Sequence, residues 1–201
     1  GVEKDDKEAG KWFRKAAEQG CAKAQVNLGF MYANGDGGLQ DDKEAVEWYR
    51  KAALQGYAKA QATLGHMYDY GKGVVKDDVE AVKWFRKSAG QGNAVGQYNL
   101  GRMYDEGEGV LEDDKEAVEW YRKAALQGNA NAQFNLALMY DEGEGVVRDY
   151  VTAYAWWNIA AANGDTEAAT EKDNTAKQMT PAQIIQAQAL SQTLSRQIRT
   201  P

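Results

Sequence analysis

The chain has 201 residues, of which 43% are hydrophobic and 27% are charged, and its formal net charge is −6. This acidic balance disfavours a general nucleic-acid binder, which needs a basic face, and it disfavours docking on anionic membranes. No apolar run approaches the roughly 20 residues that cross a bilayer, so we expect no direct membrane insertion.

Cys21 is the only cysteine, which excludes an intrachain disulfide. An intermolecular disulfide through Cys21 stays possible, because the residue follows a helix-ending glycine and is expected to be exposed. The compartment stays open between the cytoplasm and, if a signal peptide was removed, the periplasm or the exterior.

A period of 36 residues runs through the chain. The segment DDKEAVEWYRKAALQG occurs identically at 41–56 and 113–128, and single columns of alanine, glycine, leucine, methionine and tyrosine keep the same spacing. Tryptophan follows the period at Trp12, Trp48, Trp84, Trp120 and Trp156. Invariant columns are expected to pack against the next repeat, with the tryptophans as buried wedges.

In chain order, residues 1–20 are predicted to form an orphan second helix. Each repeat that follows is predicted to contain two helices, which in the second repeat cover about 58–69 and 77–91. Asp77 followed by Glu80 resembles a capping box, and Gly92 sits where a left-handed residue ends a helix. The repeats are 21–56, 57–92, 93–128 and 129–164.

After residue 164 the pattern decays, and residues 165–201 are predicted to form a degenerate helix and a C-terminal cap. Thr180 and Pro181 form a helix start that opens a helix to about residue 198. Its polar face suits the capping helix that repeat arrays need. We therefore predict a single all-α domain over 1–201, an α/α superhelical repeat solenoid of eleven helices.

The columns A-x-x-W-[FY]-R-K-A-A-x-Q-G and A-x-A-Q-x-x-L-G-x-M-Y-x-x-G-x-G-V resemble the Sel-1-like repeat family, relatives of tetratricopeptide repeats, over about residues 5–164. The closing segment from AYAWWNIAAANGD to MTPAQIIQAQALS resembles the end of bacterial members. The resemblance implies a superhelix that acts as an adaptor or scaffold and binds partners on its concave side.

Four columns of the first helix vary between repeats, and their offsets of 0, 3, 7 and 11 place them on one helical stripe. Equivalent positions line the concave groove of tetratricopeptide repeats. Because these columns vary, we expect them to be free of packing duty, and their aromatic residues ringed by charge are typical of binding hot spots. Packing against adjacent helices is the alternative. The residues predicted to bind a protein or peptide, named here the first-helix stripe, are Phe30, Lys59, His66, Tyr70, Tyr98, Arg102, Glu106, Phe134 and Leu138.

The sequence offers little for catalysis or metal binding. His66 is the only histidine, so a two-histidine metal site is excluded. The Gly-x-Gly loops lack the further residues of phosphate-binding motifs, and the acidic loops at 105–108 and 141–144 miss the EF-hand spacing. We predict no catalytic residue, no cofactor and no metal, and a monomeric protein that is not an enzyme. The alternatives are a hydrolase acting on cell-wall or drug-like substrates and a structural spacer in a longer protein.

Overall fold

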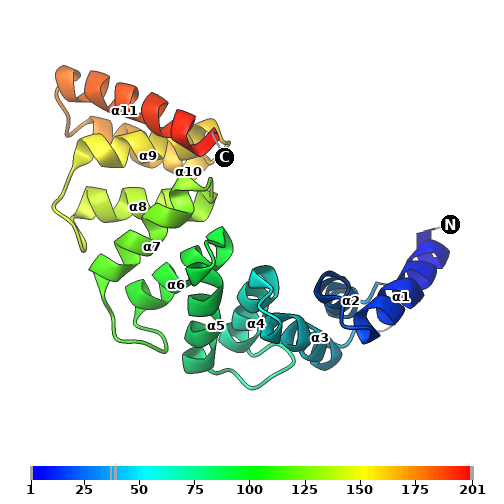
Figure 1. Ribbon diagram of the computed structural model, residues 1–201. Helices are drawn as coiled ribbons and strands as arrows, with labels where there is room; N and C mark the ends of the chain where they lie inside the picture. Colours follow the sequence, from blue (N-terminus) through cyan, green and yellow to red (C-terminus); the bar gives the residue numbers. More distant parts are fainter. Residues whose placement is uncertain (1, 37, 39, 200–201) are drawn as a thin grey trace. The chain divides into compact units, whose positions relative to one another are not determined.

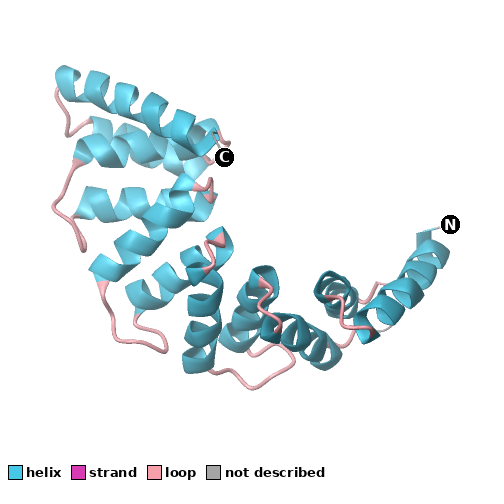
Figure 2. Ribbon diagram, in the orientation of Figure 1, coloured by secondary structure: helices cyan, strands magenta, loops and turns pink. Residues whose placement is uncertain are grey.

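The computed structural model describes residues 2–36, 38 and 40–199, with side chains described from Gly10 to Ile198 except at 37 and 39. Within these residues the protein contains helices and no strand, which confirms the predicted fold class (Figures 1 and 2). The helices are α1 (Val2–Glu18), α2 (Ala22–Asn34), α3 (Asp42–Leu54), α4 (Ala58–Tyr70), α5 (Asp78–Gly90), α6 (Ala94–Glu106), α7 (Asp114–Leu126), α8 (Ala130–Glu142), α9 (Tyr150–Ala162), α10 (Thr166–Ala176) and α11 (Pro181–Arg199).

Packing divides the chain into two compact units. Unit 1 comprises Gly1–Gly96 and Glu108–Val110, and unit 2 comprises Gln97–Gly107 and Leu111–Pro201. In unit 1, α1 packs on α2, α2 on α3, α3 on α4, and α4 on α5. In unit 2, α9 packs against α8, α10 and α11. This consecutive pairing is typical of a repeat solenoid, and the single domain over 1–201 stays a prediction.

The helix ends follow the local sequence. The Asp77 carboxylate accepts a hydrogen bond from the backbone N–H of Glu80 at 2.9 Å, as an N-cap should. Gly92 adopts φ +81° just after α5 and ends that helix. At α11 the box is reciprocal: the Thr180 N–H donates to Gln183 Oε1 at 2.8 Å, and the Gln183 N–H donates to Thr180 Oγ1 at 3.3 Å. The predicted start and stop signals are confirmed.

Helices of one repeat approach closely where the first helix carries a glycine. A Cβ at Gly65 in α4 would lie 2.7 Å from the Phe85 ring, and a Cβ at Gly101 in α6 would lie 2.8 Å from the Tyr121 ring. The glycine therefore makes room for an aromatic ring from the following helix.

The loops join each repeat to the one before it. Gly73 lies in the loop between α4 and α5 with φ +68°, and a Cβ there would lie 2.2 Å from the carbonyl oxygen of Asp42 in the first turn of α3. Gly145 meets Asp114 of α7 in the same way at 2.4 Å. Only glycine fits such a position, since both its φ and its backbone contact exclude a side chain. Val74 tucks its loop against the core of unit 1, as the sequence indicates.

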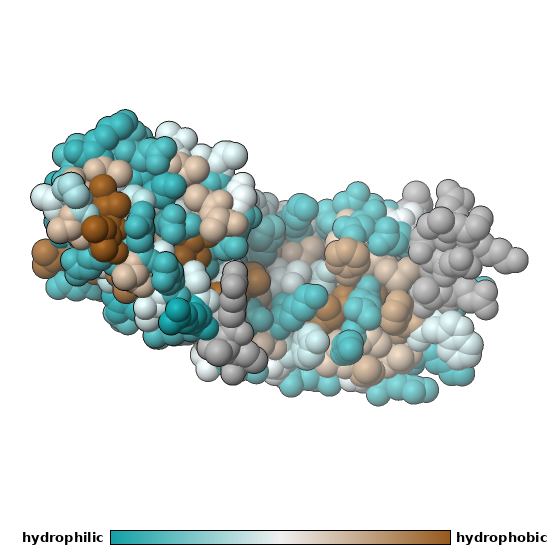
Figure 3. All heavy atoms as spheres, turned by 90° about the horizontal axis from the view of Figure 1, so that it is seen from above, coloured by the Kyte–Doolittle hydropathy of each residue, from teal (hydrophilic) through white to brown (hydrophobic). Residues whose placement is uncertain are grey.

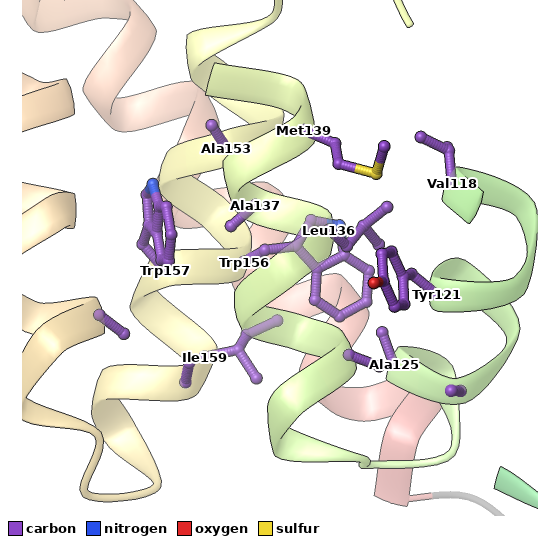
Figure 4. Close-up of a cluster of buried hydrophobic side chains, with 14 of the residues drawn as sticks. Val118, Tyr121, Ala125, Leu136, Ala137, Met139, Ala153, Trp156, Trp157 and Ile159 are labelled. Carbon is purple, nitrogen blue, oxygen red and sulfur yellow. The ribbon is translucent and has the colours of Figure 1, made fainter. Parts of the chain in front are cut away.

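The core of unit 2 lies between α7, α8 and α9 (Figure 4). Trp156 and Ile159 of α9 are buried with Leu136 of α8 and Tyr121 of α7. Burial of side chains of this size contributes about 1.5–3 kcal/mol each, so this cluster is a main source of stability.

Two of the five repeating tryptophans depart from the predicted buried position. Trp12 is 67% exposed, and Trp120 is half-buried with its Nε1 donating to Glu116 at 3.1 Å. The others are buried against the preceding repeat: Trp48 packs on Ala17 and Leu28. The prediction that Trp12 is a buried wedge is wrong.

A ladder of glutamines links successive repeats. Buried glutamines in the first helices donate to backbone carbonyl oxygens at 3.1 Å, in the pairs Gln25–Ala17, Gln61–Ala53 and Gln133–Ala125. A second glutamine, 30 residues after each first-helix glutamine, donates from its Nε2 to the Oε1 of that first-helix residue. The pairs are Gln55–Gln25 (2.8 Å), Gln91–Gln61 (2.6 Å) and Gln127–Gln97 (2.6 Å). The next place in this column holds the shorter Asn163. Gln133 Oε1 is buried there without a hydrogen-bond partner.

Candidate functional site

In unit 1 the first-helix stripe presents large side chains to solvent. Phe30 on α2 is 56% exposed and Tyr70 at the end of α4 is 61% exposed. His66 lies one turn before Tyr70, and their rings stack with centroids 4.3 Å apart and planes at 28°. Lys59 is exposed near the start of the same helix. Exposed aromatic side chains are typical of binding hot spots.

In unit 2 the stripe is more deeply packed. Tyr98 of α6 is half-buried, with its ring centroid 5.9 Å from that of Tyr121. Phe134 of α8 packs edge-on against Trp157 with centroids 4.8 Å apart. Both rings therefore contribute to the core of this unit, and only part of each is available to a partner.

The charged members of the stripe in unit 2 bind each other. Arg102 forms an ion pair with Glu106 one turn later in α6, and its side chain is only 15% exposed. It also lies 3.3 Å from the sulfur of Met103. Leu138 of α8 is 37% exposed and remains at the surface.

The expectation that variable columns carry no packing is wrong for one column. Val26 is 6% exposed and Ala62 is 3% exposed, and the half-buried Tyr98 and Phe134 occupy the same position in the next repeats. The rings of Tyr98 and Phe134 pack against Tyr121 and Trp157 of the following helix.

A cluster of carboxylates in unit 1 was not found from the sequence. One oxygen each of Asp69, Asp78 and Glu108 lie within 4.8 Å of one another. The ammonium group of Lys76 lies 3.3 Å from Asp78 Oδ1 and 4.0 Å from Glu108 Oε1. The Asp78 carboxylate raises the pKa of Lys76, so this lysine supplies a positive charge to the cluster. We name these four residues the Lys76 cluster.

The equivalent positions in unit 2 are acidic throughout. Adding 36 to each number of the Lys76 cluster gives Asp105, Glu112, Asp114 and Glu144, so Glu112 takes the place of the lysine. Burial raises the pKa of Asp105, the hydrogen bond that the Tyr121 hydroxyl donates to Asp105 Oδ2 at 2.9 Å lowers it, and the charges of Asp114 and Glu112 raise it again. Burial also raises the pKa of Glu144, with Glu142 as the largest of its acidic neighbours. We name the four residues the Glu112 cluster.

Two further properties bear on the sequence predictions. Cys21 is exposed, as expected. Among the described residues, no helix is long and apolar enough to cross a membrane.

Comparison with solved structures finds similar bacterial proteins. A Sel1 repeat protein from Oxalobacter formigenes is 40% identical with a TM-score of 0.77, and the match covers 83% of this chain and 66% of that one. A protective antigen of uropathogenic Escherichia coli with an SLR fold is 36% identical with a TM-score of 0.61, covering 92% of this chain and 48% of that one. The chain thus spans about two thirds and about half of the length of these two proteins. No curated protein sequence matches the chain.

The family comparison agrees with the 36-residue period and with the paired helices. The model described as Sel1 repeat matches residues 1–21, 22–57, 58–93, 94–129 and 130–165. Its boundaries lie one residue after those predicted from the sequence. Since these matches cover most of the chain, the protein belongs to the Sel1 repeat family.

Proposed function

We propose that this protein is a non-enzymatic scaffold that binds a protein or peptide segment through the first-helix stripe. Sel1 repeat proteins generally mediate protein–protein interactions and are generally non-enzymatic. The observation that carries the proposal is the exposure of Phe30, His66 and Tyr70 at variable positions of unit 1. Aromatic side chains that are more than half exposed stabilise the fold less than buried ones do, and a partner that covers them gains the remaining apolar area.

The stripe has different surroundings in each unit. In unit 1 it consists of Phe30, Lys59, His66 and Tyr70, and all four side chains are exposed. The part in unit 2 consists of Tyr98, Arg102, Glu106, Phe134 and Leu138. There the rings of Tyr98 and Phe134 are held by Tyr121 and Trp157, which fixes them in place before a partner arrives. Such preorganisation lowers the entropy lost on binding.

The stacked geometry of His66 supports a contact role over a catalytic one. Its ring lies against Tyr70 at 4.3 Å, as part of an exposed aromatic surface. The hydrolase alternative requires a nucleophile next to a base. The stacking of His66 on Tyr70 does not favour that alternative. The spacer alternative gives no reason for aromatic residues that are more than half exposed.

The test is to map the partner-binding face with a crosslinker and then to measure affinities. A photoreactive residue at position 70 is expected to crosslink to the partner, and one at position 54 is not. Leu54 is a matched control, because it is 71% exposed on α3 and lies outside the stripe. Truncation of Tyr70 to alanine is expected to weaken binding of the crosslinked partner by about 1–3 kcal/mol, whereas Leu54→Ala should stay within about 0.5 kcal/mol. Loss of binding in Leu54→Ala with no effect of Tyr70→Ala and Phe30→Ala would refute the assignment.

A further inference from the structure

The helices α2 and α4 of unit 1 expose lysine and aromatic side chains but no carboxylate. Every residue of these two helices is described, and the exposed ones are Lys23, Phe30 and Asn34 in α2 and Lys59, His66 and Tyr70 in α4. The chain as a whole has a net charge of −6. The exposed residues of α3 include two lysines and two glutamates, and those of α8 in unit 2 include Glu142 and no cation. The exposed sides of α2 and α4 are therefore positive in an acidic protein.

The two lysines on these helices are unpaired. Among the residues that the structure describes, neither Lys23 nor Lys59 forms an ion pair. Other lysines of unit 1 have a partner within the fold: the ammonium group of Lys51 lies 3.7 Å from the centre of the Trp48 ring, and that of Lys83 lies 2.9 Å from Glu80 Oε2. The charges of Lys23 and Lys59 are thus available to an anionic group from a partner.

Helical spacing puts each lysine on the same side of its helix as a ring. Lys23 precedes Phe30 by seven residues, and Lys59 precedes His66 by seven. Seven residues make about two turns, so each lysine lies about 10 Å along the axis from the ring on its own face. Tyr70 lies one further turn along α4 and stacks on His66, with centroids 4.3 Å apart.

The exposed residues of α2 and α4 belong to one packed part of unit 1. Both helices pack on α3, and Val26 of α2 lies in the same buried cluster as Leu64 of α4. Figure 3 shows hydrophobic side chains set among hydrophilic ones on the face of the molecule that it presents. We name the exposed residues of the two helices the α2–α4 face, which comprises Lys23, Phe30, Asn34, Lys59, His66 and Tyr70.

We propose that the α2–α4 face binds an acidic protein segment, in which aspartate or glutamate stands near an apolar residue. The carboxylates of the segment meet Lys23 and Lys59. Its apolar side chains cover Phe30 and the stacked rings of His66 and Tyr70. The inference rests on the proposed function and names the chemistry of the partner at the unit 1 part of the first-helix stripe.

Charge favours this occupant over others. Carboxylates that approach unpaired lysines speed association, and a basic segment is repelled by the same lysines. Nucleic acid requires a more extensive basic surface than two lysines in a chain with a net charge of −6. A second copy of the chain brings that same net charge, which opposes self-association. An uncharged segment can cover the rings, but it gains nothing from the lysines.

The test compares charge reversal on the α2–α4 face with charge reversal elsewhere. Short random peptides displayed on phage are selected against the full chain at low salt, and clones that lose affinity on Tyr70→Ala are kept. Their affinities are then measured on the double variant Lys23→Glu/Lys59→Glu and on the control Lys43→Glu/Lys115→Glu, which changes the net charge equally. Lys43 and Lys115 are exposed in the first turns of α3 and α7, and neither forms an ion pair with a described residue.

We expect the kept clones to be rich in aspartate and glutamate and to carry an apolar residue nearby. Their affinity should fall about tenfold or more on Lys23→Glu/Lys59→Glu and change less than about twofold on the control, because only the former sets like charges against each other. The loss should shrink at high salt, which screens exposed charges. A second selection, against Lys23→Glu/Lys59→Glu itself, should return clones with lysine or arginine in place of the acidic residues. Thermal unfolding by circular dichroism verifies that both double variants are folded.

Different results contradict this inference and the proposed function. Clones that depend on Tyr70 but are not acidic, and that bind Lys23→Glu/Lys59→Glu as tightly as the wild type, would refute the inference and leave the proposed function in place. If no clone depends on Tyr70 or Phe30, the proposed function is wrong and the inference fails with it. A single-stranded oligonucleotide, or a second copy of the chain in sedimentation, that binds the wild type and not Lys23→Glu/Lys59→Glu would identify another occupant and overturn the inference.

Discussion

Lengthening Asn163 to glutamine should complete the glutamine ladder of unit 2. Gln133 Oε1 is buried without a partner, and Asn163 stands where the other repeats have a glutamine that donates to this oxygen. The backbone is already suitable, because Asn163 has φ −89° and its equivalents Gln91 and Gln127 have the same value. One added methylene should bring Nε2 to about the 2.6 Å seen in the two pairs before it.

The magnitude follows from the cost of a buried acceptor that lacks a hydrogen bond. Leaving such a group unsatisfied costs about 1–3 kcal/mol, and a new neutral hydrogen bond contributes about 1 kcal/mol net. Because the side chain of residue 163 is exposed and must be ordered, we expect Asn163→Gln to stabilise by about 1 kcal/mol. For a chain of this size that corresponds to a rise of about 2–4 °C in melting temperature.

The measurement is thermal and urea unfolding followed by circular dichroism. The reciprocal variant is Gln91→Asn in unit 1, which should remove the 2.6 Å bond, leave Gln61 Oε1 buried, and destabilise by about 1–2 kcal/mol. Asn163→Gln could lower stability or leave it unchanged while Gln91→Asn destabilises. In that case the lack of a glutamine at position 163 is not the reason that Gln133 Oε1 has no hydrogen-bond partner. If both variants are neutral, the ladder does not stabilise the repeats.

Three further predictions concern packing, backbone and charge. Trp84→Ala should destabilise by about 3–5 kcal/mol in urea unfolding, because the indole is 6% exposed, whereas Trp12→Ala should stay within about 0.5 kcal/mol. Gly73→Ala should lower the free energy of unfolding by about 2 kcal/mol or more, because the new Cβ would collide with the backbone of Asp42. In the control Gly92→Ala the new Cβ would meet no atom within 4 Å, so only the positive φ should count, at about 1–2 kcal/mol. Glu112→Gln should stabilise by about 0.5 kcal/mol at pH 7. The pKa values of Asp105 and Glu144 are raised in the fold, so these two carboxyl groups stabilise it at low pH and lose that effect as pH rises through the raised values. The gain from Glu112→Gln should therefore shrink in melts as pH is lowered.

The elements of the fold were predictable because their signals are local. Asp77 caps α5 with a hydrogen bond to a residue three positions later, and Gly92 ends it through its own φ. Both act within one helical turn, so the sequence alone reveals them. The Thr180 and Pro181 start of α11 was predicted for the same reason.

The parts that escaped prediction depend on neighbours far along the chain. Tyr98 lies in a column that varies between repeats, yet its ring packs on Tyr121. Variation between repeats therefore does not show that a column is free of packing. The Lys76 cluster likewise joins residues from the end of α4, the start of α5 and the loop between α6 and α7, and no short motif encodes it. Which residues of the first-helix stripe bind a partner stays a prediction.

The contact of each loop glycine with the preceding repeat also has an evolutionary consequence. A 36-residue segment carries both halves of a junction: the glycine that fits the repeat before it, as Gly73 fits Asp42, and the helix start that receives the glycine of the repeat after it, as Asp78 receives Gly109. Unequal crossing-over in steps of one period can therefore lengthen or shorten the gene without creating a new interface. The identical segments at 41–56 and 113–128 are two periods apart, which fits the copying of a two-repeat unit. Recombination out of that frame would set a side chain against the carbonyl oxygen and abolish the junction.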